Sequence, residues 1–319
     1  MATKSASRRL LGWGQLAIFV IAFGVSAIGS SLLEHEQHIW DKFLVVAGIG
    51  DFPAMKEDYL TQFREDFSPR PARIKCPRQT ARTMVAVVLG QSNAANYAQV
   101  RTEAHDPRVT VFYRGACYEA RDPLLGASGS RGSVWPVFAH SVIASGRYDN
   151  LVLVPAAIGG TSMESWSPGG VYYDRIESRL ERLAHAGLRP THFLISQGEL
   201  EADSGQDGRS YQGFAERLLR ELNGTGAQVF LATTGRCIRR PNPAIRAAQE
   251  RARRATGSFA GPDMDAIGPE HRVNGCHLDA AGAKTVAAGW AAAVLSQAEA
   301  QALQKPLTNS SLATARTRS

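Results

Sequence analysis

The sequence is poor in cysteine, and this limits the kinds of site that it can hold. Its 319 residues include four cysteines, and no two of them form a close Cys-x-x-Cys pair. Structural zinc sites commonly use such pairs, so a zinc site is not expected. The formal net charge is +7, but no basic stripe interleaved with aromatic residues is present, so nucleic-acid binding is not indicated. The sequence contains no internal repeat and gives no reason to expect a metal ion or an organic cofactor.

One long uncharged run, residues 10–33, follows Lys4, Arg8 and Arg9. The run is long enough to span a bilayer, which takes about 20 residues. The basic residues before it place the N-terminus in the cytoplasm. No Ala-x-Ala site ends the run, so an uncleaved transmembrane anchor is favoured over a cleaved signal peptide. Either alternative predicts that the rest of the chain lies outside the cytoplasm.

The cysteine count is even, which permits two disulfides in an exported chain. Four cysteines allow three pairings, and the sequence does not choose between them. We expect Cys76–Cys117, which would tie the segment before the domain to the core. We also expect Cys237–Cys276, which would brace the loop that carries His277. Four free thiols are the alternative.

Composition divides the chain into four segments. Residues 1–33 form the cytoplasmic tip and the anchor or signal sequence, and the proline-containing residues 34–82 form a connecting stalk with one amphipathic helix around 55–67. Residues 83–304 form the folded domain. The tail 305–319 is rich in Ser, Thr and Ala and is expected to be disordered.

The folded domain alternates apolar strand candidates with helical segments, which predicts an α/β fold with a mostly parallel sheet covered on both faces. The expected strands are 83–89, 109–113, 150–155, 191–196 and 228–233. The expected helices are 135–146, 172–186, 209–223, 242–256 and 280–303. Ligands of such sheets bind where the carboxyl ends of the strands meet.

A valine-rich run ends at Gly90 and is followed by Gln91-Ser92-Asn93. A buried strand that stops at a glycine and presents a serine on the next turn is a common way to hold a nucleophile rigidly. Asn93 and Ala94 follow the serine, so this is not the Gly-x-Ser-x-Gly motif. A plain helix cap is the alternative for the Ser-Asn pair.

Three later stretches also carry polar or glycine residues. Residues 157–162, with the pair Gly159-Gly160, and residues 196–199, with Gln197-Gly198-Glu199, each lie at the end of a predicted strand. Residues 274–279, with His277, precede the last predicted helix. Paired glycines let backbone amides approach a ligand closely. A tight turn and a polar loop are the alternatives for the first two stretches. Asp279 is expected to cap the last helix.

These motifs, in this order, resemble the SGNH (GDSL-like) hydrolase superfamily, and its sialate O-acetylesterase-like carbohydrate esterases in particular. The resemblance covers roughly residues 84–295. It implies a three-layer α/β/α sandwich, similar to flavodoxin, that cleaves an ester, often an acetyl group on a sugar, with residues 83–304 as the esterase domain.

The resemblance also implies roles for individual residues. Ser92 matches the nucleophile and His277 the general base. The backbone amides of Ser92 and Gly160 match two oxyanion donors, with Gly159 as the alternative for the second, and the Gln197 side chain matches the third. Three more residues are expected to contact substrate: Gln91, Asn93 and Trp166. Trp166, Trp135 and Tyr172 could stack on a sugar, or they could belong to the core.

Two positions depart from the family pattern. Asn274 stands where the family usually has an aspartate three residues before the histidine, and Ser196 stands where it usually has a histidine. In a serine-protease triad the change from Asp to Asn costs about 10⁴ in turnover. Another carboxylate could orient His277, and the candidates are Glu199, which we prefer, Asp263, Asp265 and Asp279.

The sequence therefore predicts a membrane-anchored serine esterase that removes O-acetyl groups from a carbohydrate through a Ser-His acyl-enzyme. The first alternative is an O-acyltransferase that acts on envelope polysaccharide. The second is a carbohydrate-binding domain whose catalysis is impaired by Asn274 and Ser196. The expected partners are an acetylated carbohydrate and the membrane.

Overall fold

The structure is a computed structural model that describes residues 71–102, 106–238 and 240–304. The predicted membrane segment at 10–33, the predicted helix at 55–67 and the tail 305–319 lie outside the described residues. Within the described part of the chain, no helix is both long enough and apolar enough to cross a membrane.

The domain is built on one eight-stranded sheet with the order β1-β4-β3-β5-β2-β6-β7-β8. The six strands from β3 to β8 in this order pair in parallel, whereas β4 and β1 pair antiparallel at one edge. The strands are β1 (Arg73–Ile74), β2 (Thr83–Gly90), β3 (Val109–Tyr113), β4 (Ala116–Glu119), β5 (Asn150–Pro155), β6 (His192–Ser196), β7 (Gln228–Thr233) and β8 (Phe259–Asp263). All five expected strands are confirmed, and β1, β4 and β8 were not predicted.

The central strand β2 shows why this sequence forms a sheet with two covered faces. All eight of its residues are buried. Because side chains alternate along a strand, Met84 and Val88 point to one face and Val85 and Val87 to the other, and each set belongs to a different hydrophobic core. An unbroken apolar run is what a parallel strand covered on both sides requires.

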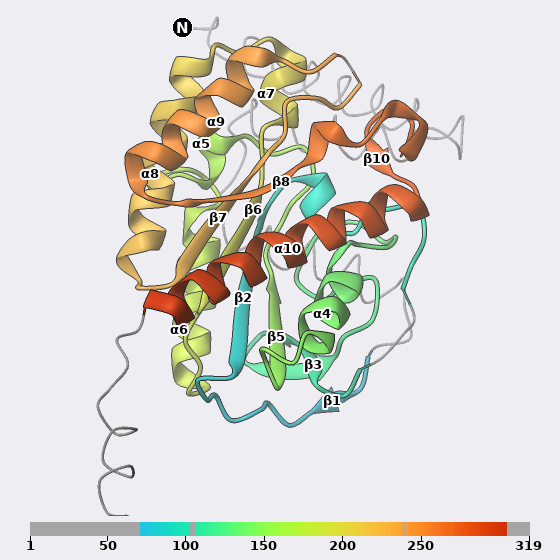
Figure 1. Ribbon diagram of the computed structural model, residues 1–319, viewed down its shortest axis with the longest axis vertical. Helices are drawn as coiled ribbons and strands as arrows, with labels where there is room; N and C mark the ends of the chain where they lie inside the picture. Colours follow the sequence, from blue (N-terminus) through green and yellow to red (C-terminus); the bar gives the residue numbers. More distant parts are fainter. Residues whose placement is uncertain (1–70, 103–105, 239, 305–319) are drawn as a thin grey trace, which may run out of the picture. The chain divides into compact units, whose positions relative to one another are not determined.

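Helices cover both faces of the sheet and make three layers (Figure 1). One face packs against α4 (Trp135–Ala144) and α10 (Ala280–Gln304). The other face packs against α5 (Met163–Trp166), α6 (Tyr173–His185), α8 (Gly208–Gly224) and α9 (Pro243–Thr256). The short helix α7 (Glu199–Ser204) follows β6. The five expected helices are confirmed to within two residues at each end.

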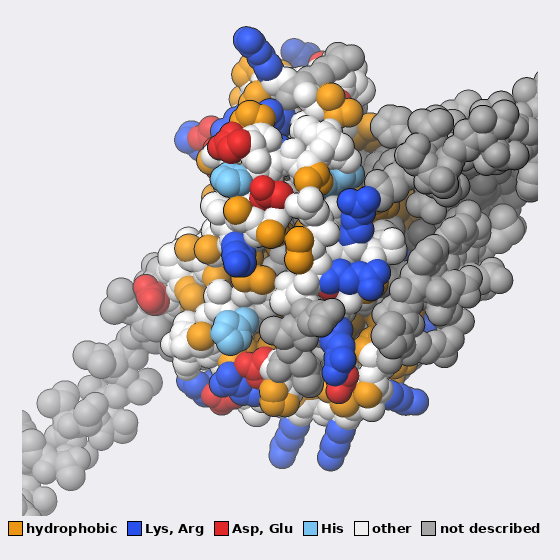
Figure 2. All heavy atoms as spheres, turned by 90° about the vertical axis from the view of Figure 1, so that its right-hand side faces the viewer, with side chains coloured by type: hydrophobic (Ala, Val, Ile, Leu, Met, Phe, Trp, Pro, Cys, Tyr) orange, Lys and Arg blue, Asp and Glu red, His pale blue; other side chains and the backbone are white. Residues whose placement is uncertain are grey.

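The surface mixes charges of both signs. On the face seen in Figure 2, Lys and Arg side chains are interspersed with acidic and apolar ones. The arginines of α9 have local partners: Arg246 bonds to Asp263 and Asp265, and Arg254 pairs with Glu250. These contacts favour a solvated face for α9 over a site for acidic polysaccharide.

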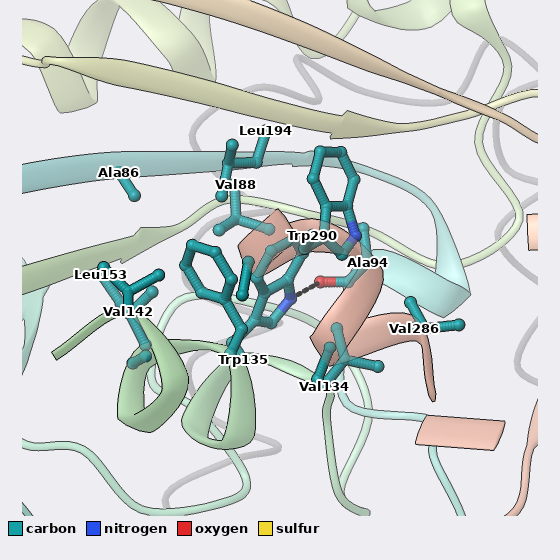
Figure 3. Close-up of a cluster of buried hydrophobic side chains, with 14 of the residues drawn as sticks. Ala86, Val88, Ala94, Val134, Trp135, Val142, Leu153, Leu194, Val286 and Trp290 are labelled. Atoms are coloured by element: carbon teal, nitrogen blue, oxygen red, sulfur yellow. Dashed lines mark hydrogen bonds between the residues drawn. The ribbon is translucent and has the colours of Figure 1, made fainter. Parts of the chain in front are cut away.

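Two tryptophans join both helices of one face to the turn after β2 (Figure 3). The Trp135 indole Nε1 donates to the Ala94 carbonyl at 2.7 Å, and its ring lies 5.6 Å from that of Trp290 on α10. Trp135 is 1% exposed, so it is a core residue and not part of a sugar-stacking wall.

The segment before β2 belongs to the sheet. Within the range expected to be a stalk, Arg73 and Ile74 form β1 and pair with β4. A disulfide joins Cys76 to Cys117 on β4, and a second joins Cys237 to Cys276, so the expected pairing is confirmed.

Candidate active site

Three of the four sequence motifs meet at the carboxyl ends of three adjacent strands. β2 lies between β5 and β6, and the chain leaves β2 toward one side of the sheet and later crosses from β5 to the other side (Figure 1). Such a switch point opens a crevice for ligands. Ser92 follows β2, the Gly159-Gly160 loop follows β5 and Gln197 follows β6.

The turn that carries Ser92 depends on a glycine. Gly90 has φ +121°, and a Cβ there would lie 1.9 Å from the Ser196 carbonyl oxygen. The next residue, Gln91, donates its N–H to that same oxygen at 3.1 Å. β2 and β6 therefore stay paired up to the turn, and the 3₁₀ turn η1 (Ser92–Ala94) starts at once. Ser92 is 4% exposed on this rigid support.

The glycine loop after β5 offers one backbone donor rather than two. The Gly159 N–H donates to Ser128 Oγ at 2.8 Å. Gly160 has φ +70° and is only partly buried. Of the two candidate oxyanion donors in this loop, Gly160 is therefore the better one.

Gln197 is fully buried and braces the same loop. Its Nε2 donates to the Thr161 carbonyl at 2.7 Å and to Glu201 Oε2 at 3.1 Å. Gln91 Oε1 is 3.3 Å from the same nitrogen and also accepts from the Leu200 N–H. The amide hydrogens of Gln197 thus have acceptors within the protein, and its role as an oxyanion donor stays a prediction.

Trp166 was expected beside the substrate. It is 1% exposed, and its Nε1 donates to Thr161 Oγ1 at 2.8 Å. Its ring packs against that of Tyr172, with centroids 5.4 Å apart. In this structure Trp166 supports the glycine loop from the core side and does not offer a face to a sugar.

Two buried glutamates lie behind the serine turn. Asn93 Nδ2 donates to Glu199 Oε1 at 3.0 Å. Burial raises the pKa of Glu199, against the opposing effect of Asn93. Burial also raises the pKa of Glu201 to about 7. Glu201 accepts from the Met163 N–H and from Gln197, so it links α7 to α5 and the glycine loop.

A small hairpin, β9 (Arg272–Val273) and β10 (His277–Leu278), carries the histidine. It packs against η1, so His277 is brought to the turn that holds Ser92. Asn274 has φ +49°, a left-handed conformation that asparagine tolerates better than most residues. Its Oδ1 accepts from the His277 backbone N–H at 3.2 Å, and its Nδ2 lies 3.1 Å from His277 Nδ1.

Each of the four candidate carboxylates bonds to a side chain other than His277. Asp263 and Asp265 bond to Arg246, and Glu199 bonds to Asn93. Asp279 lies 3.3 Å from His271 Nδ1 and accepts from the Gly282 N–H at 2.7 Å, which confirms its expected role as the cap of α10. The side chain in contact with His277 Nδ1 is that of Asn274.

Sequence reasoning missed three residues near the site. The Tyr97 ring is stacked on His277, with centroids 5.2 Å apart and planes at 27°. Ser128 holds the Gly159 N–H, and Arg272 donates from a buried guanidinium to the Cys276 carbonyl at 2.7 Å. The one sequence signal for Tyr97 is its position five residues after Ser92.

The second disulfide anchors the histidine hairpin. Cys276 precedes His277 and is bonded to Cys237 in the loop after β7. That loop is held by Asp203, whose carboxylate accepts from the Cys237 and Ile238 backbone N–H groups. In the described part of the chain, no group of three His, Cys, Asp or Glu side chains could hold a metal ion.

A serine at the switch point of a mostly parallel sheet, with a later hairpin that carries a histidine packed against the serine turn, fits a hydrolase of the SGNH class. The comparisons agree with this class. Residues 82–296 match the family described as carbohydrate esterase, sialic acid-specific acetylesterase, and the chain belongs to this family of carboxylic ester hydrolases.

Two known proteins illustrate the similarity. A probable carbohydrate esterase from Arabidopsis thaliana is 33% identical over 87 residues, which cover 27% of this chain and 34% of the plant protein. The solved structure of this plant protein superimposes with a TM-score of 0.55 at 19% identity and covers 68% of this chain and 99% of its own. A carbohydrate acetylesterase from Xanthomonas citri has a TM-score of 0.45 at 15% identity. The match covers 66% of this chain and 55% of the Xanthomonas chain.

Proposed function

We propose that this protein is a serine esterase that removes O-acetyl groups from a carbohydrate through an acyl-enzyme. The observation that carries the proposal is the packing of the His277 hairpin against the Ser92 turn, at the switch point of the sheet. Family membership supports ester hydrolysis, and the family's description as sialic acid-specific acetylesterases supports an acetylated sugar as the substrate class.

The reaction has two steps. Ser92 Oγ attacks the acyl carbon while His277 Nε2 takes the serine proton, and the tetrahedral intermediate collapses when the imidazolium returns a proton to the leaving sugar oxygen. Water then attacks the acetyl-serine by the same route and releases acetate. The backbone N–H groups of Ser92 and Gly160 stabilise the oxyanion in both steps, and removal of one such donor costs about 3 kcal/mol in a comparable site.

The orientation of the Asn274 amide controls the histidine tautomer. When Nδ2 faces His277 Nδ1, it donates to that nitrogen, and the ring proton is then on Nε2, which cannot accept from Ser92. When the amide is turned, Oδ1 accepts from Nδ1–H and Nε2 becomes the base. The turned amide loses its bond to the His277 backbone N–H, which helps to hold the hairpin in this structure. General-base catalysis therefore requires that this bond be broken.

The test is covalent labelling of Ser92. We expect a fluorophosphonate probe to add one adduct to the folded domain by intact mass, and we expect the adduct to be absent in Ser92→Ala and strongly reduced in His277→Ala. Acetate release from acetylated sugars should follow the same order. A folded wild-type domain that is neither labelled nor active would exclude the esterase.

Asn274 favours one other function, a carbohydrate-binding domain with impaired catalysis. This alternative predicts glycan binding that is equal in the wild type, Ser92→Ala and His277→Ala, with no acyl-enzyme trapped by rapid acid quench. The esterase predicts a trapped acetyl group on Ser92 in the wild type alone.

We also propose that the domain is exported and anchored by residues 10–33. Two disulfides support an oxidising compartment, because disulfides persist there and are rare in the cytosol. The domain would then lie on the periplasmic or extracellular side, so protease added to cells with a permeabilised outer envelope and an intact cytoplasmic membrane should remove it and leave a short membrane-bound fragment. A domain that stays protected in such cells would contradict export, and release of the domain without detergent would contradict the anchor.

A further inference from the structure

Tyr97 joins two parts of the site that the sequence leaves far apart. Its ring is stacked on the His277 imidazole, with a centroid separation of 5.2 Å and an angle of 27° between the planes. Its hydroxyl lies against the glycine loop, where a Cβ on Gly159 would be 2.8 Å from the Tyr97 oxygen. One side chain thus contacts the histidine and the loop that supplies an oxyanion donor.

Two glycines fix the position of this ring. Gly159 does not have a positive φ, so its lack of a side chain is explained by space: a Cβ there would meet three atoms of Tyr97 within 3.1 Å. A Cβ on Gly129 would also lie close to the ring, 2.8 Å from Tyr97 Cε2. The ring therefore fills a space that two glycines leave open, and its face is directed at His277.

The stacked ring matters because of the charge that His277 gains during the reaction. When the histidine takes the serine proton it becomes a cation, and the residue beside its Nδ1 is Asn274, which carries no negative charge. The face of a phenol ring is electron-rich and attracts a cation within about 6 Å. An interaction that is stronger with imidazolium than with imidazole lowers the barrier, because it is stronger in the transition state than in the ground state.

We propose that Tyr97 is a positioning residue that holds His277 and stabilises its imidazolium, in place of part of the charge that an aspartate at position 274 would supply. The inference rests on the proposed Ser-His mechanism. It explains how His277 can act as a base beside Asn274. It also explains why glycines stand at positions 129 and 159, since they leave room for the Tyr97 ring.

The elements around the histidine hairpin also carry charged groups. The elements packed against β10 are β9, η1 and α10. β9 contributes Arg272, the first turns of α10 contribute Lys284, and Asp279 with its partner His271 flanks the hairpin. Behind η1, Glu199 is bonded to Asn93. A Tyr97 substitution removes none of these groups, so we expect a change in the titration of His277 to report on the ring.

The experiment compares Tyr97→Leu with Tyr97→Phe. Loss of the ring should lower kcat by about twofold to thirtyfold, which corresponds to the range of cation–π strengths, with a smaller change in KM. The acidic limb of the kcat/KM profile should also move to lower pH, by roughly 0.3 to 1.5 units, because an imidazolium without the ring loses its proton more easily. Tyr97→Phe keeps the ring face and should restore both quantities.

An aromatic residue beside a different histidine provides the control. Tyr148 packs edge-on against His192, with centroids 6.0 Å apart, in the core. Tyr148→Leu should lower thermal stability and leave the pH profile unchanged. If Tyr97→Leu lowers kcat without moving the acidic limb, or if Tyr97→Phe fails to restore it, the ring has only a packing role and the inference is wrong.

A second measurement separates this inference from the proposed function. Proton NMR of the His277 ring in a Ser92→Ala background gives the titration midpoint without any need for activity. A midpoint that falls in Tyr97→Leu supports the stacking role even if the wild type proves not to be an esterase. An unchanged midpoint in an active enzyme overturns the stacking role and leaves the esterase intact.

Discussion

At the scale of single residues, we expect Asn274 to limit the activity of His277 as a general base. An aspartate at this position would accept from both the His277 backbone N–H and Nδ1–H, so no amide would have to turn. We expect Asn274→Asp to raise kcat for acetylated substrates by at least tenfold, with the 10⁴ effect of the reverse change in a protease triad as an upper guide. Steady-state kinetics at pH 7 to 8 measure the gain.

Asn274→Ala is the matched control for this gain. Alanine removes both contacts of the amide, and we expect its kcat to fall below that of the wild type. If the aspartate variant is folded and no faster than the wild type, another group already orients His277, and our account of the tautomer is wrong.

Gly90 is a second position where one added atom, a Cβ, is expected to change stability strongly. Gly90→Ala would place a Cβ 1.9 Å from the Ser196 oxygen at φ +121°, and we expect the free energy of unfolding to fall by more than 3 kcal/mol. Gly146 has φ +71° with nothing within 4 Å of an added Cβ, so Gly146→Ala should cost only about 1 to 2 kcal/mol. Equal losses in urea denaturation would contradict a steric role for Gly90.

At the scale of elements, the two disulfides allow a matched comparison. Cys76–Cys117 and Cys237–Cys276 close loops of nearly equal length, with sequence separations of 41 and 39, so each should stabilise the fold by about 4 kcal/mol in the loop-entropy model. Only the second holds the histidine hairpin. Replacing its cysteines by serine should lower kcat by about tenfold to a hundredfold, because small misplacements of a catalytic group are costly.

Replacement of Cys76 and Cys117 by serine should lower stability to a similar extent and leave kcat nearly unchanged at low temperature. Circular dichroism establishes that both double variants are folded before their rates are compared. Equal kcat values in the two variants would show that the hairpin keeps its place without the bond.

At the scale of the whole molecule, the buried Glu201 makes stability depend on pH. Its pKa in the folded state is raised to about 7 by burial, above the value in the unfolded chain. Between these two values the folded state binds more protons, so stability falls as the pH rises toward 7 and is then constant. The full cost is on the order of 3 kcal/mol.

We expect Glu201→Gln to remove this part of the pH dependence. The test is the free energy of unfolding in urea at pH 5 and pH 8, whose difference should shrink by about 2 to 3 kcal/mol in the variant. Glu164→Gln changes an exposed carboxylate near the same loop and should leave the difference as it is in the wild type. An unchanged difference in Glu201→Gln would mean that other groups determine the pH dependence.

The strands and helices could be predicted where they depend on the pattern of neighbouring residues in the sequence. Buried parallel strands such as β2 and β5 contain apolar runs rich in Val and Leu, and their positions follow from the sequence alone. β8 was missed because Gly261 and Pro262 interrupt its apolar pattern, as an edge strand permits. β1 and β9 have two residues each, too few for any periodicity.

The meeting of the motifs at the carboxyl ends of the strands was predictable from the sequence, whereas the packing around them was not, and the roles of the site residues stay predictions. Ser92 and His277 carry recognisable neighbours in the chain, whereas the stacking of Tyr97 depends on how a hairpin near residue 277 is folded back over a turn near residue 92. Trp166 was placed beside the substrate because it follows the glycine loop, but its indole N–H is used by Thr161, which turns the ring into the core.

The central place of β2 has a consequence for the order in which the site forms during synthesis. β2 is made before the other strands of the parallel sheet, yet both of its neighbours come later: Val87 pairs with Val154 on β5 and with Phe193 on β6. Such distant pairings form slowly and leave unpaired strands exposed meanwhile. A nascent chain carries Ser92 long before the ribosome reaches His277, so the two motifs come together only after almost the whole domain has been translated.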